Sequence, residues 1–152
     1  MKLTIHKVHT RQDLELCADI WLAASVAGQA FVPPEFWKSR RQSMVDIYLP
    51  ASEVFMGSVQ GQEAGFYALS GTTLAALFIL PEFWGKGVGG ALLRRLQGNR
   101  QRIDLYVYKQ NQRALRFYES KGFLPVRVQV CPHTGEAEIL MVWKAQDISC
   151  GI

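Results

Sequence analysis

The sequence predicts an α/β (α+β) protein in which a mixed sheet is flanked by helices. Segments whose apolar residues alternate, as in strands, are interspersed with segments whose apolar residues follow helical spacing. A short apolar strand, a glycine-rich turn and a helix start also follow one another directly between Leu74 and Arg95. With 152 residues, of which 49% are hydrophobic and 20% charged, we expect a single domain over residues 1–145 and a C-terminal tail, 146–152.

The first half of the chain is expected to contain a strand over residues 3–8 and then two helices. Thr10 and Asp13 resemble a capping box at the start of the first helix, with Asp where Glu or Gln is usual. The second helix is expected at about residues 35–49, after a loop with two adjacent prolines. From residue 53 the apolar residues recur at every second position, as in strands, and the Gln60-Gly61 pair indicates a hairpin. The central apolar strand, residues 74–80, follows a second turn.

The second half continues with a helix to about Gln97, a strand over 103–108 and a helix that begins at Asn111. A hairpin over 123–143 closes the pattern. The expected order is therefore strand, two helices, three strands, helix, strand, helix, two strands.

The glycines after the central strand predict an anion site. Glycine allows a ligand to approach the backbone closely, and the free N–H groups at a helix start carry partial positive charge. A phosphate or pyrophosphate is expected there. A tight turn without a ligand is the simpler alternative. A dinucleotide-binding fold is disfavoured, because the glycines come in mid-chain and Asp104 begins its strand rather than ending it. The glycines are Gly85, Gly87, Gly89 and Gly90.

Composition argues against several other classes. The formal charge of +4 is spread along the chain, so no dense basic face for nucleic acid is expected. The three cysteines are far apart, which suggests neither a disulfide framework nor a metal site and fits reduced thiols in a cytoplasm. The N-terminus lacks the apolar region of a signal peptide. An uncharged run over 64–81 is interrupted by a turn, so two strands are expected rather than a membrane helix.

Two motifs resemble those of the GNAT superfamily of acetyl-CoA-dependent N-acyltransferases. PEFWGKGVGGALL is similar to the family's pyrophosphate loop and the helix after it, and VYKQNQRALRFYESKGF is similar to its second signature segment. The expected element order matches the family fold over roughly Leu3 to Lys144. The resemblance implies a mostly antiparallel, six- to seven-stranded sheet with about four helices, and acetyl-CoA as cosubstrate.

The resemblance also assigns candidate site residues. Backbone groups of the central strand would pair with the pantetheine arm, the glycine loop would hold the pyrophosphate, and Asn111 would touch the cofactor near its thioester. Tyr118 would be the general acid. The strand residues are Leu77, Phe78 and Ile79, and the loop residues are Gly85, Lys86, Gly87, Val88, Gly89 and Gly90.

The family's reaction is direct attack of an amine on the thioester through a tetrahedral intermediate that expels a thiolate. A phenol can protonate that thiolate, and the backbone N–H of Ile79 is a plausible oxyanion donor. Without the family resemblance, Tyr118 beside Phe117 is better explained as a core aromatic.

Two positions depart from the family pattern. Trp84 stands where Gln or Arg is usual, which removes one polar contact from the loop. Tyr106 stands where several protein-acetylating relatives have a glutamate that helps to deprotonate the amine. Glu35, a water chain, Tyr106 or Tyr67 are the candidate routes for that proton.

The acceptor is not specified by the sequence. A small metabolite, an antibiotic-like amine, and a protein lysine or N-terminus all remain open, as does a longer acyl group. Phe31, Glu35 and Trp37 are candidate lining residues, although a surface-packed loop explains them as well, and Tyr106 is a further substrate-binding candidate. A non-catalytic acetyl-CoA-binding module is the alternative function. A monomer or a homodimer is expected, without a nucleic acid, membrane or metal partner.

Overall fold

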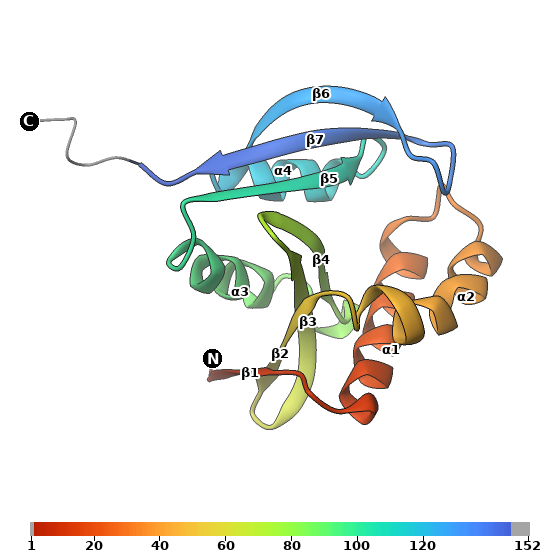
Figure 1. Ribbon diagram of the computed structural model, residues 1–152, viewed down its shortest axis with the longest axis vertical. Helices are drawn as coiled ribbons and strands as arrows, with labels where there is room; N and C mark the ends of the chain where they lie inside the picture. Colours follow the sequence, from red (N-terminus) through yellow and green to blue (C-terminus); the bar gives the residue numbers. More distant parts are fainter. Residues whose placement is uncertain (1, 147–152) are drawn as a thin grey trace, which may run out of the picture. The chain divides into compact units, whose positions relative to one another are not determined.

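A computed structural model describes residues 2–146 (Figure 1). The chain divides into two compact units, Met1–Leu93 and Arg94–Ile152. The described residues form seven strands and four α-helices in the order expected, and the predicted fold class is confirmed. Of the expected tail, residues 147–152 lie outside the described residues, and Cys150 is among them. Cys17 and Cys131 are free thiols.

The first unit contains a four-stranded antiparallel sheet in the order β1-β2-β3-β4. The hairpin between β2 and β3 turns at Gln60 and Gly61, whose φ angles of 51° and 79° are those of a two-residue hairpin turn. Phe66 and Met56, at the centre of the sheet, are fully buried. The strands are β1 (Leu3–Lys7), β2 (Glu53–Val59), β3 (Gln62–Ser70) and β4 (Thr73–Ile79).

Helix α1 (Arg11–Gly28) packs against β3 and β4 of this unit (Figure 1). The Thr10 hydroxyl oxygen accepts a hydrogen bond from the Asp13 N–H at 3.1 Å, so the expected N-cap is present. Cys17 on the inner face is fully buried, and burial raises the pKa of its thiol to about 12. This cysteine is therefore a protonated core residue at neutral pH.

The second helix is shorter than expected and ends in an unusual turn. α2 (Pro34–Ser43) is followed by a π-helical turn, Met44–Tyr48, in place of one regular helix over 35–49. The Leu49 N–H donates to the carbonyl of Met44 at 2.9 Å, five residues back.

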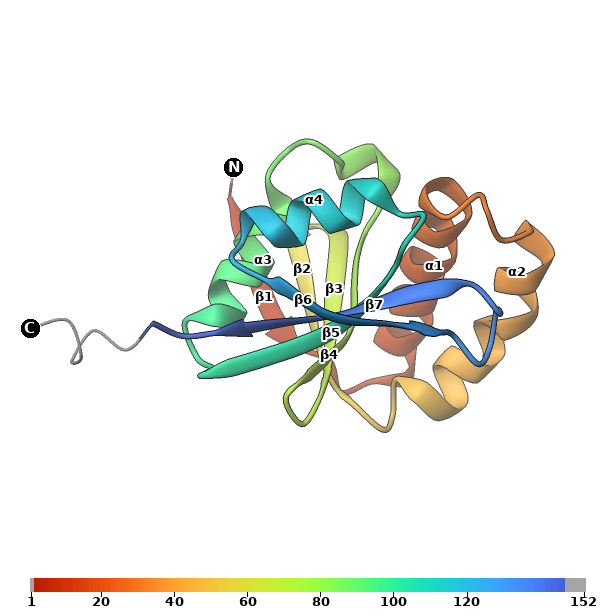
Figure 2. The same cartoon turned by 90° about the horizontal axis from the view of Figure 1, so that it is seen from above.

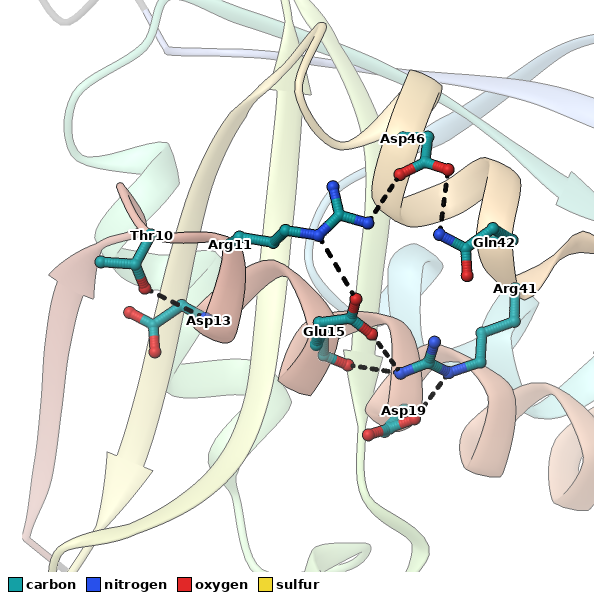
Figure 3. Close-up of polar contacts among 8 residues, drawn as sticks. All are labelled: Thr10, Arg11, Asp13, Glu15, Asp19, Arg41, Gln42 and Asp46. Atoms are coloured by element: carbon teal, nitrogen blue, oxygen red, sulfur yellow. Dashed lines mark hydrogen bonds and ion pairs between the residues drawn. The ribbon is translucent and has the colours of Figure 1, made fainter.

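A network of ion pairs and hydrogen bonds links α2 and the π-helical turn to α1 (Figure 3). The Arg41 guanidinium donates to Asp19 at 2.7 Å and to Glu15 at 2.8 Å. Arg11 donates to Asp46 at 2.9 Å, and its Nε lies 3.7 Å from Glu15. Hydrogen bonds from Gln42 and Arg11 lower the pKa of the Asp46 carboxyl. These contacts fix α2 and the π-helical turn in place against α1.

We expect Arg41→Leu to lower the free energy of unfolding by about 1 kcal/mol at low ionic strength, since both acids lose their shared partner. Urea denaturation measures the effect. The difference from the parent should shrink in about 1 M salt, which screens charges over about 3 Å. Lys38→Leu is the matched control, because exposed Lys38 on the same helix makes no ion pair with a described residue. An equal loss in both variants would exclude the network as its cause.

The second unit contains a three-stranded antiparallel sheet in the order β5-β7-β6, with helix α4 (Gln112–Ser120) close to it (Figure 2). Ile103, Leu105 and Met141 form its buried face. Gly122, with φ of 92°, ends the helix as the sequence predicts. The strands are β5 (Arg102–Tyr108), β6 (Leu124–Val130) and β7 (Ala137–Lys144). Among residues 2–146, no helix is long and apolar enough to cross a membrane.

Candidate active site

The end of β4 directs part of its backbone away from β3. The Leu80 N–H donates to the Ala64 carbonyl of β3 at 2.8 Å. Hydrogen-bonded and non-hydrogen-bonded positions alternate in an antiparallel pair, so Phe78 is also bonded to β3. Leu77 and Ile79 are the alternate positions, and their N–H and C=O groups point away from β3. Two of the three predicted strand residues thus present backbone groups that β3 does not use.

A close approach between β3 and β4 occurs at this same point. Gly65 lies opposite Ile79, and a Cβ on Gly65 would come within 2.8 Å of the Phe78 carbonyl oxygen and closer still to the Ile79 side chain. Only glycine fits there without displacing β4. Gly65 is not among the predicted site residues, although an isolated glycine within a strand is a recognised sign of a close backbone approach.

Trp84 has a different role from the polar residue that the family pattern has at this position. Its indole N–H donates to the Ile79 carbonyl at 2.7 Å. The far edge of the ring faces Gly28 at the end of α1, where a Cβ would lie 3.4 Å from Trp84 Cη2. The tryptophan therefore connects the end of β4 to the end of α1, a contact that sequence reasoning missed.

We expect Trp84→Phe to lower the free energy of unfolding by about 1 to 2 kcal/mol, because the Ile79 carbonyl loses its donor while an aromatic ring is retained. Guanidinium denaturation followed by circular dichroism measures this. Trp143→Phe is the control for the loss of ring area, since the indole N–H of Trp143 donates to no described residue. Equal losses in the two variants would assign the effect to ring area rather than to the hydrogen bond.

The glycine loop joins β4 to helix α3 (Val88–Gln97) through a 3-10 turn, Pro81–Phe83. Gly85 and Gly87 have φ angles of 76° and 83°, a region that favours glycine, and a Cβ on either would meet no atom within 4 Å. The loop is therefore both specific to glycine and open on the side where a side chain would project.

The first turn of α3 leaves its backbone donors available. The Gly87 carbonyl accepts the first helical hydrogen bond, from Ala91 at 3.1 Å, which makes Gly87 the residue before the helix. Glycine has no side chain with which to cap the N–H groups of the first turn, so these remain free for an anion. The donors belong to Val88, Gly89 and Gly90, all predicted site residues.

Lys86 adds positive charge beside these donors. It is exposed, and its ammonium lies 5.6 Å from the centre of the Phe83 ring. A cation at this place favours a multiply charged anion over a neutral ligand.

The remaining predicted cofactor residue, Asn111, belongs to the second unit and has a structural role there. Its side-chain oxygen accepts from the Ala114 N–H at 3.1 Å and so caps α4. The side-chain NH₂ group of Asn111 is not used by the cap.

Tyr118, the predicted general acid, lies near the end of α4. Its ring packs edge-on against Phe117 and Phe123, with centroids 5.1 and 5.4 Å apart. Burial raises the pKa of the Tyr118 phenol above its ordinary value near 10. The hydroxyl makes no hydrogen bond with a residue in the described part of the chain. The phenol therefore stays protonated at neutral pH, as a proton donor must.

The candidate substrate residues lie in both units. Phe31 is half-buried in the connection between α1 and α2, and Glu35 is exposed in the first turn of α2. Tyr106, on β5 in the second unit, is 44% exposed. Tyr67 is buried and stacked on Phe55, with ring centroids 5.1 Å apart. Among residues 2–146, no three His, Cys, Asp or Glu side chains are grouped so that they could hold a metal ion.

Comparisons with known proteins show the family to which this chain belongs. A family model for the acetyltransferase (GNAT) domain matches residues 50–125, which include parts of both units. The chain is 30% identical over 114 residues to the peptidyl-lysine N-acetyltransferase YiaC of Escherichia coli, a match that covers 74% of this chain and 78% of that relative.

Solved structures share the fold. The apo form of YjaB from Escherichia coli has a TM-score of 0.82 at 24% identity and covers 94% of this chain and 98% of its own. The PaiA N-acetyltransferase from Thermoplasma acidophilum in complex with coenzyme A has a TM-score of 0.75 at 19% identity, over 95% of this chain and 100% of its own. Together with the family match and the YiaC identity, this places the chain in the GNAT family, as an N-acetyltransferase.

Proposed function

We propose that this enzyme, as a single domain over residues 1–145, transfers the acetyl group of acetyl-CoA to the ε-amino group of a lysine in a peptide or protein. The observation that carries the acetyl-CoA assignment is the open glycine loop before α3, with its uncapped N–H donors directly after β4. The lysine acceptor is supported by the similarity to YiaC, a peptidyl-lysine N-acetyltransferase.

The residues of the first unit fit the cofactor's polar parts. A doubly charged diphosphate suits several converging N–H groups and the adjacent Lys86. The loop from Gly85 to Gly90 would hold it, because the space that a Cβ would take at Gly85 and Gly87 is open. The backbone groups of Leu77 and the second lone pair of the Ile79 carbonyl would pair with the amides of the pantetheine arm. The NH₂ group of Asn111, in the second unit, would bind nearer the thioester.

The thioester supplies an acetyl group that is activated toward amines. We assign Tyr118 as the general acid. The carbon–nitrogen bond forms and the carbon–sulfur bond breaks; the nitrogen gives one proton to solvent, and Tyr118 Oη gives one proton to the departing sulfur and then regains one from solvent. The N–H of Ile79 points away from β3 and would stabilise negative charge on the acetyl oxygen.

The amine must first lose the proton that makes it an ammonium ion, since its reference pKa is near 10.4. Glu35 is the best placed of the candidate bases for a solvent-accessible route, because its carboxylate is exposed at the start of α2. Tyr67 is less suitable, since it is buried against Phe55.

A thiol-release assay with acetyl-CoA and a panel of amines tests the proposal. The panel consists of Nα-acetyl-lysine amide, a blocked peptide with a free N-terminus and no lysine, and small diamines. We expect release with the lysine compound to exceed release with the others. No release with any amine, together with retained acetyl-CoA binding, would instead indicate a non-catalytic acetyl-CoA-binding module.

A further inference from the structure

Strand β6, in the second unit, is an edge strand with one unpaired side. Among residues 2–146 it forms a ladder with β7 alone and lies at the end of the order β5-β7-β6 (Figure 1). The free backbone groups of such an edge can pair with a further strand, and most edges are protected by lysines, prolines or bulges. Here Pro125 and the bulge after it protect only the start of β6. Residues 126–130 are therefore an open segment of the edge.

The backbone groups of this open segment alternate in direction. The Cys131 N–H donates to the Glu136 carbonyl at 2.8 Å, where the chain turns from β6 to β7. Bonded and non-bonded positions alternate along an antiparallel pair, so Gln129 also bonds to β7. The N–H and C=O groups of Val128 and Val130 therefore point away from β7 and are available to another strand.

The side chains of the open segment are largely apolar and exposed. Val126 and Val128 are each 58% exposed, and Val130 is 67% exposed. Among the described elements, β6 contains the most exposed large apolar residues. β-Branched residues favour extended structure, and covering them with another strand removes apolar surface from water.

The sequence of the open segment is self-complementary. Residues 126–130 read VRVQV, which is symmetric about Val128 except that Arg127 corresponds to Gln129. Two such strands in an antiparallel pair centred on Val128 place each valine opposite a valine and Arg127 opposite Gln129. The two Val128 residues, whose backbone groups point outward, then exchange two hydrogen bonds. A second copy of this chain therefore fits the edge.

Charge favours this register over its neighbours. Gln129 Nε2 donates to Glu138 Oε1 at 3.0 Å, so a carboxylate lies beside each Gln129. In the pair centred on Val128, Arg127 of each copy faces this amide and carboxylate of the other, which is favourable. A pair centred on Arg127 would instead bring two like charges directly opposite. A pair centred on Gln129 would leave only residues 128–130 of the strand paired.

We propose that two copies of this chain associate through β6, in an antiparallel pair centred on Val128. The three-stranded sheets of the two second units then form one continuous sheet. The proposal concerns association alone and does not depend on the acetyl-transfer reaction. The strand pair is a small interface, and interfaces below about 1,200 Å² are typical of weak association. The dimer is therefore expected to form at high protein concentration.

Sedimentation of the parent between about 1 μM and about 1 mM protein tests the association, since this range includes weak dissociation constants. We expect the mass to rise from that of one chain to that of two. Val128→Lys should remain monomeric, because two ammonium groups would lie opposite each other at the centre of the pair. Ile47→Lys is the matched control, since Ile47 in the π-helical turn is 59% exposed, and it should dimerise as the parent does.

Two complementary variants test the register. One carries Val126→Lys and Val130→Lys, and the other carries Val126→Glu and Val130→Glu. In the proposed register Val126 of each copy faces Val130 of the other, so each variant alone should be monomeric and their equimolar mixture should form heterodimers. Val128→Pro replaces Val128→Lys if the latter does not fold, because it removes an outward N–H that β7 does not use.

Three results would overturn the proposal. They are a parent that stays monomeric over the whole range, a Val128→Lys variant that dimerises as the parent does, and a mixture of the two complementary variants that stays monomeric. Masses above that of two copies that persist in Val128→Lys would also overturn it, and would assign the exposed valines to nonspecific association.

Discussion

Gly87→Glu is expected to weaken acetyl-CoA binding at least about a hundredfold, which corresponds to about 2.7 kcal/mol. Gly87 has φ of 83°, its Cβ would project into open space, and its carbonyl accepts the first hydrogen bond of α3. A carboxylate at this position would bring negative charge to the donors proposed for the diphosphate and would fill the space above them. Calorimetric titration of the protein with acetyl-CoA measures the loss.

Gly61→Glu is the control for the backbone strain that any non-glycine residue has at positive φ. Gly61 in the hairpin turn has φ of 79° and is equally open, so this variant adds the same charge and a similar strain far along the chain from the loop. We expect it to lose stability but to keep parental acetyl-CoA affinity. Parental affinity in Gly87→Glu would locate the diphosphate outside this loop.

Tyr118→Phe is expected to lower kcat about a hundredfold or more, while the dissociation constant of acetyl-CoA and Tm remain close to parental values. The ring packs on Phe117 and Phe123, and phenylalanine preserves that packing. The hydroxyl makes no hydrogen bond within the described part of the chain, so removing it leaves no unpaired partner there. Tyr48→Phe, at a tyrosine that is 45% exposed, is the control and should keep the parental kcat.

The pH profile gives a second check on Tyr118. An acid acts in its protonated form, which persists below its pKa, and burial raises the pKa of Tyr118 above its ordinary value near 10. We therefore expect kcat not to fall on the alkaline side until the pH exceeds about 10. A decline that begins near neutral pH would assign the proton donor to another group.

Local patterns predicted most of the secondary structure. The Thr10 cap, the Gln60-Gly61 turn and the Gly122 helix end follow from residue types that satisfy particular backbone positions, and each is observed. The π-helical turn after α2 was not predicted, because a regular helix and a π turn have nearly the same residue pattern and differ in which carbonyl each N–H reaches, as in the bond from Leu49 to Met44.

The candidate site was predictable only in part. The glycine loop was found from its residues, because its open positive-φ glycines are encoded locally. The bond from Trp84 to Ile79 and the approach of Trp84 to Gly28 depend on how α1 packs on β4, which no spacing along the chain encodes. The resemblance suggested a cofactor contact for Asn111, and the structure adds that half of its side chain is occupied by the cap of α4.

The tryptophan that joins α1 to β4 also connects ligand binding at one of these elements to ligand binding at the other. Any ligand that shifts the Ile79 carbonyl also shifts the indole of Trp84 and, through it, the Gly28 end of α1. Ligand binding at the strand and ligand binding at the Gly28 end of α1 are then thermodynamically coupled, and such coupling is equal in both directions. Bound acetyl-CoA should therefore change the affinity for a ligand at that helix end by the same factor by which that ligand changes the affinity for acetyl-CoA, whichever of the two binds first.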